Sequence, residues 1–489
     1  MFERMKNTLR KWGVKLGLIE ELKRIDEHKQ IDVDEEAYAR IARNKEIYSG
    51  TVPEWHLNQE VMNSNGDLIT RNRLTMGMGK VLAQKMAGLI FNEKTNISFG
   101  DKATEEFVMG VLNSNDFFKN FQRYLEYGIA LGGMAIKVYE HNRQIKLAYA
   151  AADAFYPVGN DSENVDEAIF VSKEYQDGKY YTLLEFNEWV DGVYTVKNEL
   201  YESDTSETLG TKVNLNKIYE GMETGPIGMP KLTRPLFSYF KLNTANNKNL
   251  SSPLGISIFE NSYDTLYLLD FMYDFWYNEF DLGRRRIMVD RSMLRPFPDA
   301  HGNIKMAFDT KETVFTPVNA EGQTPIDMSV ELRATDIIES INALLDILAM
   351  QTGLSAGTFT FDGKSVKTAT EVVSENSMTF QTKNSHETLV EAGIKDLIKT
   401  IIEVGKTFNL YDGKDDFEVT IDFDDSIAQD RDQNLAYYAL AVNSKLIPPV
   451  IAIQRIFNVT EKEAKEWVTM IAEHQKTMTP EFESLLGME

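Results

Sequence analysis

The sequence contains no cysteine among its 489 residues. This absence excludes a disulfide framework, a metal site built on thiolates and a cysteine nucleophile. A chain without cysteine suits a reducing cytoplasm, where disulfides do not persist.

Long hydrophobic runs are also lacking. The longest tempting stretch, Tyr127–Ile136, has ten residues without charge, whereas a membrane-spanning helix needs about 20. No segment has the pattern of a secretory signal. The first 16 residues predict a basic amphipathic helix with Phe2 and Leu9 set against Lys6. Such a helix could lie on a membrane, but we expect it to dock on its own protein or on a partner.

Positive charge is in short supply, because 52 lysines and arginines stand against 75 acidic residues and give a net charge of −23. A surface this acidic repels phosphate, so it should not coat nucleic acid. Any contact with DNA must therefore be local.

Motifs for phosphate or metal chemistry are missing as well. Gly77-Met78-Gly79-Lys80 lacks the hydroxyl residue and the glycine spacing of a phosphate loop. The six histidines form no helical pair of metal ligands. Ile427 stands where a calcium loop needs glycine, so we interpret the surrounding acidic cluster as a solvated turn. That cluster comprises Asp422, Asp424, Asp425, Asp430 and Asp432. We expect no metal and no cofactor.

The length suits two to four domains, and 43% hydrophobic residues can build sizeable cores. The chain is organised around residues 335–404, predicted as two helices joined by a glycine-broken loop. The first helix should begin at the cap pair Thr335-Asp336 and end at Gly353. Its predicted inward face consists of Ile338, Ile341, Leu345 and Leu348.

The second helical stretch starts at Val366 and could run to Gly405, but its first half is mostly Ser, Thr, Asn and Gln. Two interpretations stay open. One is an ordinary helix capped by Asn384 with Glu387 three residues on. The other is a single long helix whose polar half packs on neighbouring subunits or kinks.

Residues 60–250 predict an α+β region, with helices at 71–91 and 105–128 followed by antiparallel strands. We expect Leu74 and Val81 to face inward from the first of these helices. The strongest hairpin signals are His141-Asn142-Arg143, Asp177-Gly178 and Asp191-Gly192. Further helices are expected at 430–444, 449–457 and 461–475.

Ser251-Ser252-Pro253 predicts the start of another long helix. Aromatic residues lie around much of its circumference, which suits a large core or packing against copies of itself. Acidic residues such as Asp264 exclude contact with lipid. Three arginines, Arg284-Arg285-Arg286, close the helix. They could grip phosphate, but we favour a role in capping its negative C-terminal end.

The order of these segments resembles the portal proteins of tailed bacteriophages. An apolar helix, a Thr-Gly-Leu-Ser loop and a long helix opening with Lys367-Thr368-Ala369-Thr370-Glu371-Val372 carry the resemblance. It is strongest toward portals of siphophages that infect Gram-positive bacteria, and it covers roughly residues 60–475.

The resemblance implies an α+β, mainly helical fold divided into wing, stem, clip and crown. The implied boundaries are an N-terminal helical segment at 1–60, wing at 61–250, first stem helix at 251–282, clip at 283–332, second stem helix at 333–352, tunnel loop at 353–368, long wing helix and strand at 369–429, and crown at 430–489.

The resemblance also implies a ring, normally dodecameric, at the capsid vertex of the virion, through which double-stranded DNA is packaged and ejected. The implied partners are terminase, a head-completion adaptor, and the major capsid and scaffolding proteins. Neither catalysis nor a membrane is involved, and assembly takes place in the host cytoplasm. From the residues alone, a hydrolase or transferase with a site of scattered carboxylates is the alternative.

Portals place the tunnel loop at the narrowest point, so Lys364 and Lys367 would form belts of positive charge around the duplex. Such belts touch phosphates without reading bases. Phe359 and Phe361 would pack loop to loop between subunits. The arginines at 284–286 would form a basic patch on the clip. The alternative for the loop is an ordinary surface segment with incidental lysines.

Overall fold

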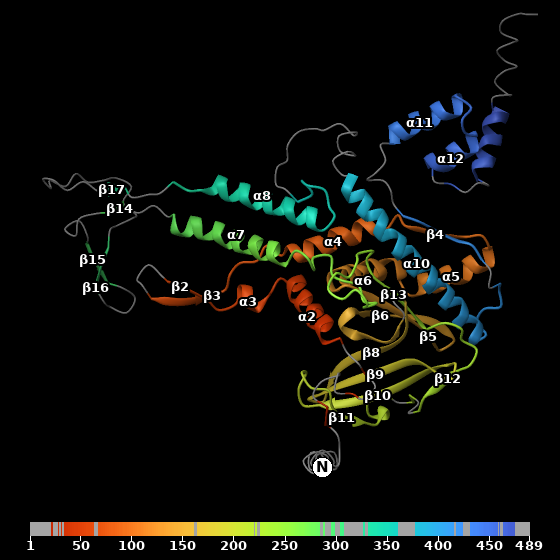
Figure 1. The fold of residues 1–489 in the computed structure, drawn as a ribbon, viewed down its shortest axis with the longest axis horizontal. Helices are drawn as coiled ribbons and strands as arrows, with labels where there is room; N and C mark the ends of the chain where they lie inside the picture. Colours follow the sequence, from red (N-terminus) through yellow and green to blue (C-terminus); the bar gives the residue numbers. More distant parts are fainter. Residues whose placement is uncertain are drawn as a thin grey trace, which may run out of the picture.

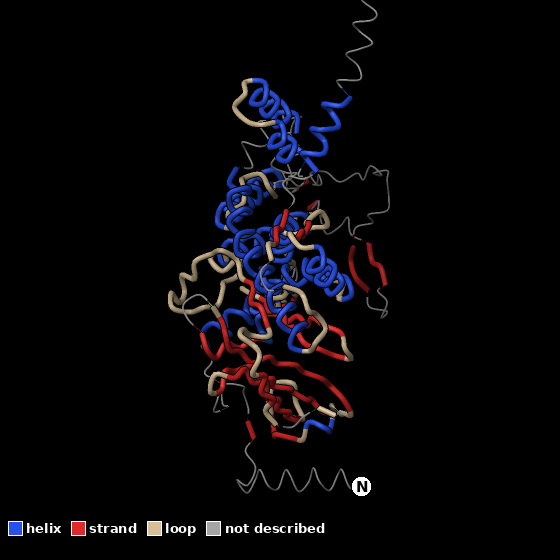
Figure 2. Tube along the Cα trace, turned by 90° about the vertical axis from the view of Figure 1, so that its right-hand side faces the viewer, coloured by secondary structure: helices blue, strands red, loops and turns tan. Residues whose placement is uncertain are grey.

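The computed structural model describes most of the chain between residues 21 and 474. The described residues are 21–22, 28, 31, 34–62, 67–160, 164–219, 221–222, 225–283, 287–288, 295–298, 304–307, 326–327, 331–359, 377–414, 417–423, 431–457, 459 and 463–474. In Figure 1, two long helices, α7 and α8, extend together to the left of a mixed body, and α11 and α12 lie at the opposite, upper corner. Figure 2 shows the strands of the largest sheet at the lower end, with helices above them.

The helices account for most of the upper part of the molecule. Their bounds are α2 Glu35–Ser49, α3 Pro53–His56, α4 Met78–Ile90, α5 Lys102–Ser114, α6 Phe117–Leu131, α7 Tyr263–Leu282, α8 Ala334–Gln351, α10 Ser377–Thr407, α11 Arg431–Asn443 and α12 Pro449–Phe457. A further helix covers 463–474. Two short 3-10 turns are η2 Ala152–Ala154 and η3 Leu215–Lys217.

The strands form antiparallel sheets. The largest has the order β1 Glu21–Leu22, β11 Gly210–Val213, β10 Val193–Ser203, β9 Lys179–Val190, β8 Val165–Gln176 and β7 Phe155–Asn160, and β12 Ile227–Met229 also pairs with β10. A three-stranded sheet has the order β13 Phe237–Phe240, β5 Met134–His141 and β6 Gln144–Ala151. The two-stranded pairs are β2 Gln59–Met62 with β3 Leu68–Arg71, β4 Asn96–Phe99 with β18 Val419–Asp422, β14 Ile287–Met288 with β17 Ile326–Asp327, and β15 Arg295–Pro298 with β16 Ile304–Ala307.

The three hairpin predictions are confirmed, because each turn joins neighbouring strands of one sheet. The two central residues of each turn have positive φ, as a tight hairpin with a right-handed strand twist requires. These residues are Asn142, Arg143, Asp177, Gly178, Asp191 and Gly192.

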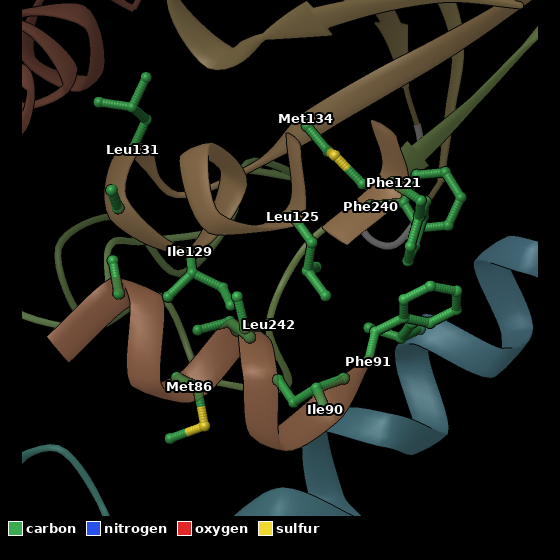
Figure 3. Close-up of a cluster of buried hydrophobic side chains, with 14 of the residues drawn as sticks. Met86, Ile90, Phe91, Phe121, Leu125, Ile129, Leu131, Met134, Phe240 and Leu242 are labelled. Atoms are coloured by element: carbon green, nitrogen blue, oxygen red, sulfur yellow. The ribbon is translucent and has the colours of Figure 1, made fainter. Parts of the chain in front are cut away.

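The main core lies where α4, α6 and α10 meet the three-stranded sheet. In Figure 3, Ile90 and Phe91 at the end of α4 face Phe121 and Leu125 on α6, with Phe240 of β13 close by. All five side chains are buried. This core ties residues from the first quarter of the chain to α10, a helix of about 46 Å at 1.5 Å per residue.

The predicted helix start at Pro253 is wrong, because α7 begins at Tyr263. Residues 251–262 instead form turns whose backbone bonds to distant elements. The amide of Ile258 donates to the carbonyl of Ile129 at 3.1 Å. A Cβ added to Gly255 would lie only 2.2 Å from the carbonyl oxygen of Gly132, so this close approach requires glycine.

The predicted helix at 71–91 is also shorter than expected. It begins at Met78, and Leu74 and Val81 are exposed rather than inward. The predicted helix at 105–128 is two helices, α5 and α6. The break lies at Asn115, whose side chain donates to the carbonyl of Ile145 and accepts from the amide of Leu147.

The helix α8 matches its prediction except at its start. Its cap residue is Arg333 rather than Thr335, and the buried residue of the first turn is Ile337, whereas Ile338 is exposed. Gly353 follows the helix with φ of 76°, as expected.

The prediction of a helix capped by Asn384 is wrong, because α10 runs unbroken through that residue.

We predict that Leu348→Ala, which empties a fully buried position on α8, lowers the free energy of unfolding by about 2–5 kcal/mol. The neighbouring Ile347 is 40% exposed, so Ile347→Ala is a matched control that should change stability by less than about 1 kcal/mol. Urea denaturation followed by tryptophan fluorescence measures both. Equal losses would show that α8 does not bury the Leu348 face.

Candidate functional site

The helices α7 and α8 lie side by side and form a projecting pair, called here the α7–α8 hairpin (Figure 1). Its seam buries Leu266 and Leu269 of α7 with Leu345 and Leu348 of α8. The short pair β14–β17 lies near its outer end, between the two helices in the sequence. The hairpin therefore carries the strand pairs β14–β17 and β15–β16 away from the main core (Figure 1).

The two helices of the hairpin carry charged side chains of one sign only. Its two helices contain eight acidic residues and no lysine, arginine or histidine. The acidic residues are Asp264, Asp270, Asp274, Glu279, Asp281, Asp336, Glu339 and Asp346. Asp264, Asp336 and Glu339 are exposed. These exposed carboxylates repel a polyanion that lies beside the arm.

Asp270 and Asp274 on α7 form what we call the carboxylate clamp. Asp270 accepts hydrogen bonds from the amide of Met76 at 2.7 Å and the hydroxyl of Thr75 at 3.1 Å. It also accepts from Nε2 of His56 at 2.7 Å. Because Nδ1 of His56 accepts from the Val52 amide, the proton of the neutral ring resides on Nε2.

Asp274 completes the clamp through Arg71 at the end of β3. The two guanidinium nitrogens approach its two oxygens at 2.7 and 2.6 Å, and the Leu74 amide donates to it at 3.1 Å. Burial alone would raise the pKa of Asp274, but the hydrogen bonds from Arg71 and Leu74 outweigh it and hold that pKa below its ordinary value. The clamp thus ties the stretch from β3 to α4 to one face of α7.

A second ion pair joins the outer ends of the hairpin. Arg333, the cap residue of α8, approaches Glu279 of α7 at 2.7 Å and also donates its backbone amide to it at 3.0 Å. Hydrogen bonds from Arg333 lower the pKa of Glu279. The same guanidinium lies over the ring of Phe275, 5.4 Å from its centre, so the entry to α8 is fixed against α7.

The first residues after α8 are pinned to α10. The amide of Ser355 donates to the hydroxyl of Thr379 at 2.9 Å, and the amide of Thr379 donates to the hydroxyl of Ser355 at 3.2 Å. The amide of Gly357 donates to Asp346 of α8 at 2.7 Å. Phe359 is half-buried against the main core of its own chain. Phe361, Lys364, Lys367 and the arginines at 284–286 lie outside the described residues.

Residues 27–477 match the protein family described as "Phage portal protein, SPP1 Gp6-like". This match covers most of the chain. The chain belongs to the phage portal protein family. Its function is that of a portal at the vertex of a phage capsid, and its place is the virion. The family is a structural one.

Solved structures with similar folds include necks of a gene transfer agent. "Neck of empty GTA particle computed with C6 symmetry" is 11% identical with a TM-score of 0.43, covering 75% of this chain and 86% of that chain. "Neck of native GTA particle computed with C12 symmetry" is 10% identical with a TM-score of 0.40, covering 82% and 96%. No curated protein sequence matches the chain.

The polar half of α10 buries charge that the sequence reasoning missed. Lys383 is fully buried and pairs with Glu387 one turn on, at 2.6 Å. Burial lowers the pKa of the neighbouring His386 to about 4. The four-residue spacing between Lys383 and Glu387 was the feature of the sequence that could have predicted this ion pair on a helix. Lys383, His386 and Glu387 are therefore part of the portal's own interior, whereas Gln381, Asn384 and Thr388 of the same stretch are exposed.

The sequence also contains a motif that is typical of hydrolases and that was overlooked. Gly353-Leu354-Ser355-Ala356-Gly357 has the spacing of a hydrolase nucleophile elbow. In that elbow the serine follows a strand and exposes its hydroxyl, whereas Ser355 follows a helix and is buried against Thr379. In the described residues 353–359, Ser355 therefore does not have the exposed geometry of a nucleophile.

The residues of the glycine-containing stretch at 77–80 have other structural roles. Gly79 packs closely on Ile47, and Lys80 pairs with Glu126, so neither is arranged around a phosphate. Burial and the neighbouring Glu391 raise the pKa of Asp422. Within the described ranges no three acidic or histidine side chains gather as metal ligands, and no helix there is long and apolar enough to cross a membrane.

We predict that Arg71→Gln destabilises the portal by about 3 kcal/mol, because it leaves the buried Asp274 carboxylate without its partner. Arg71→Lys is the matched control that keeps the charge but loses the two-pronged contact, and it should cost less. Denaturant unfolding at neutral pH measures both. A loss of less than about 0.5 kcal/mol for Arg71→Gln would contradict the clamp.

The same pair predicts a pH dependence. The pKa of Asp274 is depressed in the folded state, so its contribution is present above the ordinary aspartate pKa of about 3.9 and is lost as the pH falls below it. The stability difference between the native protein and Arg71→Gln should therefore shrink below about pH 4. A difference that grows on acidification would be inconsistent with this sign.

Proposed function

We propose that copies of this chain form a closed ring, normally of twelve, in which the α7–α8 hairpins line the tunnel for double-stranded DNA. The observation that carries the proposal is the hairpin itself, whose two helices have eight carboxylates and no basic side chain of their own. Asp270, Asp274 and Glu279 are bound by side chains of other segments, whereas Asp264, Asp336 and Glu339 are exposed. A wall with exposed carboxylates lets a duplex slide, because it holds phosphates weakly.

The exposed surface of the hairpin supports self-association. On α7, Leu268, Phe271, Tyr277 and Phe280 are each more than 40% exposed, and Met350 of α8 is 60% exposed. Such a concentration of apolar side chains marks an interaction surface. A head-to-tail contact that closes on itself buries it in every subunit.

The remaining parts then take the places that the resemblance implies. Residues 61–250 together with 369–429 form the wing, 283–332 the clip, and 430–489 the crown. The clip docks terminase during packaging and the head-completion adaptor afterwards. Terminase supplies ATP hydrolysis, and the portal itself catalyses nothing. Capsid and scaffolding proteins meet the ring as it assembles in the host cytoplasm.

The tunnel loop at 353–368 supplies positive charges that the helices α7 and α8 lack. Lys364 and Lys367 follow the anchored residues Ser355 and Gly357 in the sequence. Repeated around a ring, they form weak, salt-sensitive contacts with phosphates, as a moving duplex requires.

We predict that the purified chain assembles into rings, and twelve copies of 55.8 kDa would weigh about 670 kDa. Native mass spectrometry gives both the mass and the number of copies. A stable monomer over a wide concentration range would contradict ring formation.

We predict that Lys364→Ala with Lys367→Ala leaves rings intact but slows DNA packaging or weakens DNA retention, because the phosphate contacts are lost. The control Lys364→Arg with Lys367→Arg keeps both charges and should package normally. The readout is the amount of nuclease-protected DNA in an in vitro packaging assay. Normal packaging by the alanine variant would show that this loop does not touch the duplex.

A further inference from the structure

A cavity of about 480 Å³ lies at the C-terminal end of α10 and is not used by the tunnel described above. It is lined by the last turns of that helix, by residues 231–234 ahead of β13, and by Phe417 ahead of β18. Its size falls within the range of ordinary ligand pockets.

The charge of this cavity is opposite to that of the chain. Its lining holds Lys231, Arg234, Lys399 and Lys406 against the single carboxylate of Glu403, in a protein with a net charge of −23. This concentration of positive charge favours an anionic partner.

Two of the charged groups are fixed by their neighbours. Arg234 approaches Asp396 at 2.8 Å and Glu403 at 3.3 Å. Glu403 also accepts from the hydroxyl of Thr233 at 3.1 Å. These contacts hold one side of the cavity in a fixed conformation before a partner binds. Binding therefore costs less conformational entropy.

The cavity lies away from the proposed tunnel. Thr379, which holds the residues after α8, lies at one end of α10, and Glu403 lies 24 residues further along, about 36 Å at 1.5 Å per residue. In Figure 1 this end of α10 is on the side of the molecule opposite to α7 and α8. In a ring whose tunnel is lined by the hairpin, the cavity lies on the outer surface. This placement rests on the proposed function.

The lining also selects among anions. A DNA duplex, whose major groove alone is about 12 Å wide, does not enter a concavity of this size. The half-buried Phe417, which lies in the lining with the buried Ile402, gives it an apolar part, which a phosphate ion does not use. A peptide that carries carboxylates on both sides of an aromatic or aliphatic side chain matches both parts of the lining.

We propose that this basic cavity is a docking site for an acidic peptide segment of another protein that surrounds the portal in the particle. Its carboxylates pair with the lysines, and its apolar side chain contacts Phe417. The site ties the outer face of the ring to its surroundings and leaves the acidic tunnel untouched.

The test uses a fluorescent capped peptide, Glu-Asp-Phe-Asp-Glu, titrated with the full-length chain and followed by anisotropy. We expect saturable binding that weakens with added salt. Lys231→Gln with Lys399→Gln should weaken it at least about tenfold. The control Lys85→Gln with Lys102→Gln removes two exposed lysines elsewhere and should not change it. The uncharged peptide Gln-Asn-Phe-Asn-Gln should bind at least about tenfold more weakly.

Several results would overturn the proposal. They are absence of saturable binding, equal binding by the cavity variant, and equal binding of the uncharged peptide. Displacement by a short DNA duplex would make the site a phosphate site. Tighter binding of a peptide with the sequence of residues 480–489 would assign it to a second copy of this chain. The cavity lies within one chain, so binding and the native mass of the ring are measured independently and can fail separately.

Discussion

The arrangement of the α7–α8 hairpin depends on two carboxylates, Asp270 and Asp274. They lie one turn apart on α7 and bind the backbone and side chains that lead from β3 into α4. The helix α7 packs its buried leucines against the main core, and the clamp adds directional bonds that join residues about 200 positions apart. Arg333 with Glu279 fixes the other end.

This arrangement separates two kinds of surface. The hairpin presents carboxylates and exposed apolar side chains but no cation of its own, while the far end of α10 gathers lysines around a cavity. The long helix connects them, held at its start by Ser355 and Thr379 and along its length by the main core. This separation of charge fits the proposed function, in which the hairpin faces DNA and the cavity faces a neighbouring protein.

Local chemistry explains which parts of the fold the sequence could predict. The hairpins at Asp177-Gly178 and Asp191-Gly192 were found because positive φ is a property of the turn residues themselves. The helix starts at Pro253 and at residue 71 were wrong because distant groups capture the backbone there. Ile129 binds the amide of Ile258, and Asp274 binds the amide of Leu74. The acidic character of α7 was visible in the sequence, but its partner Arg71 was not.

The central claim is that the α7–α8 hairpin faces the axis of a ring. Because the chain has no cysteine, single substitutions Glu339→Cys on α8 and Tyr175→Cys on β8, both exposed, can carry spin labels. The spacing between labels on adjacent copies grows with their distance from the axis, and double electron–electron resonance on assembled rings measures it. A shorter distance at position 339 than at position 175 is the predicted result, and the reverse order would contradict the account.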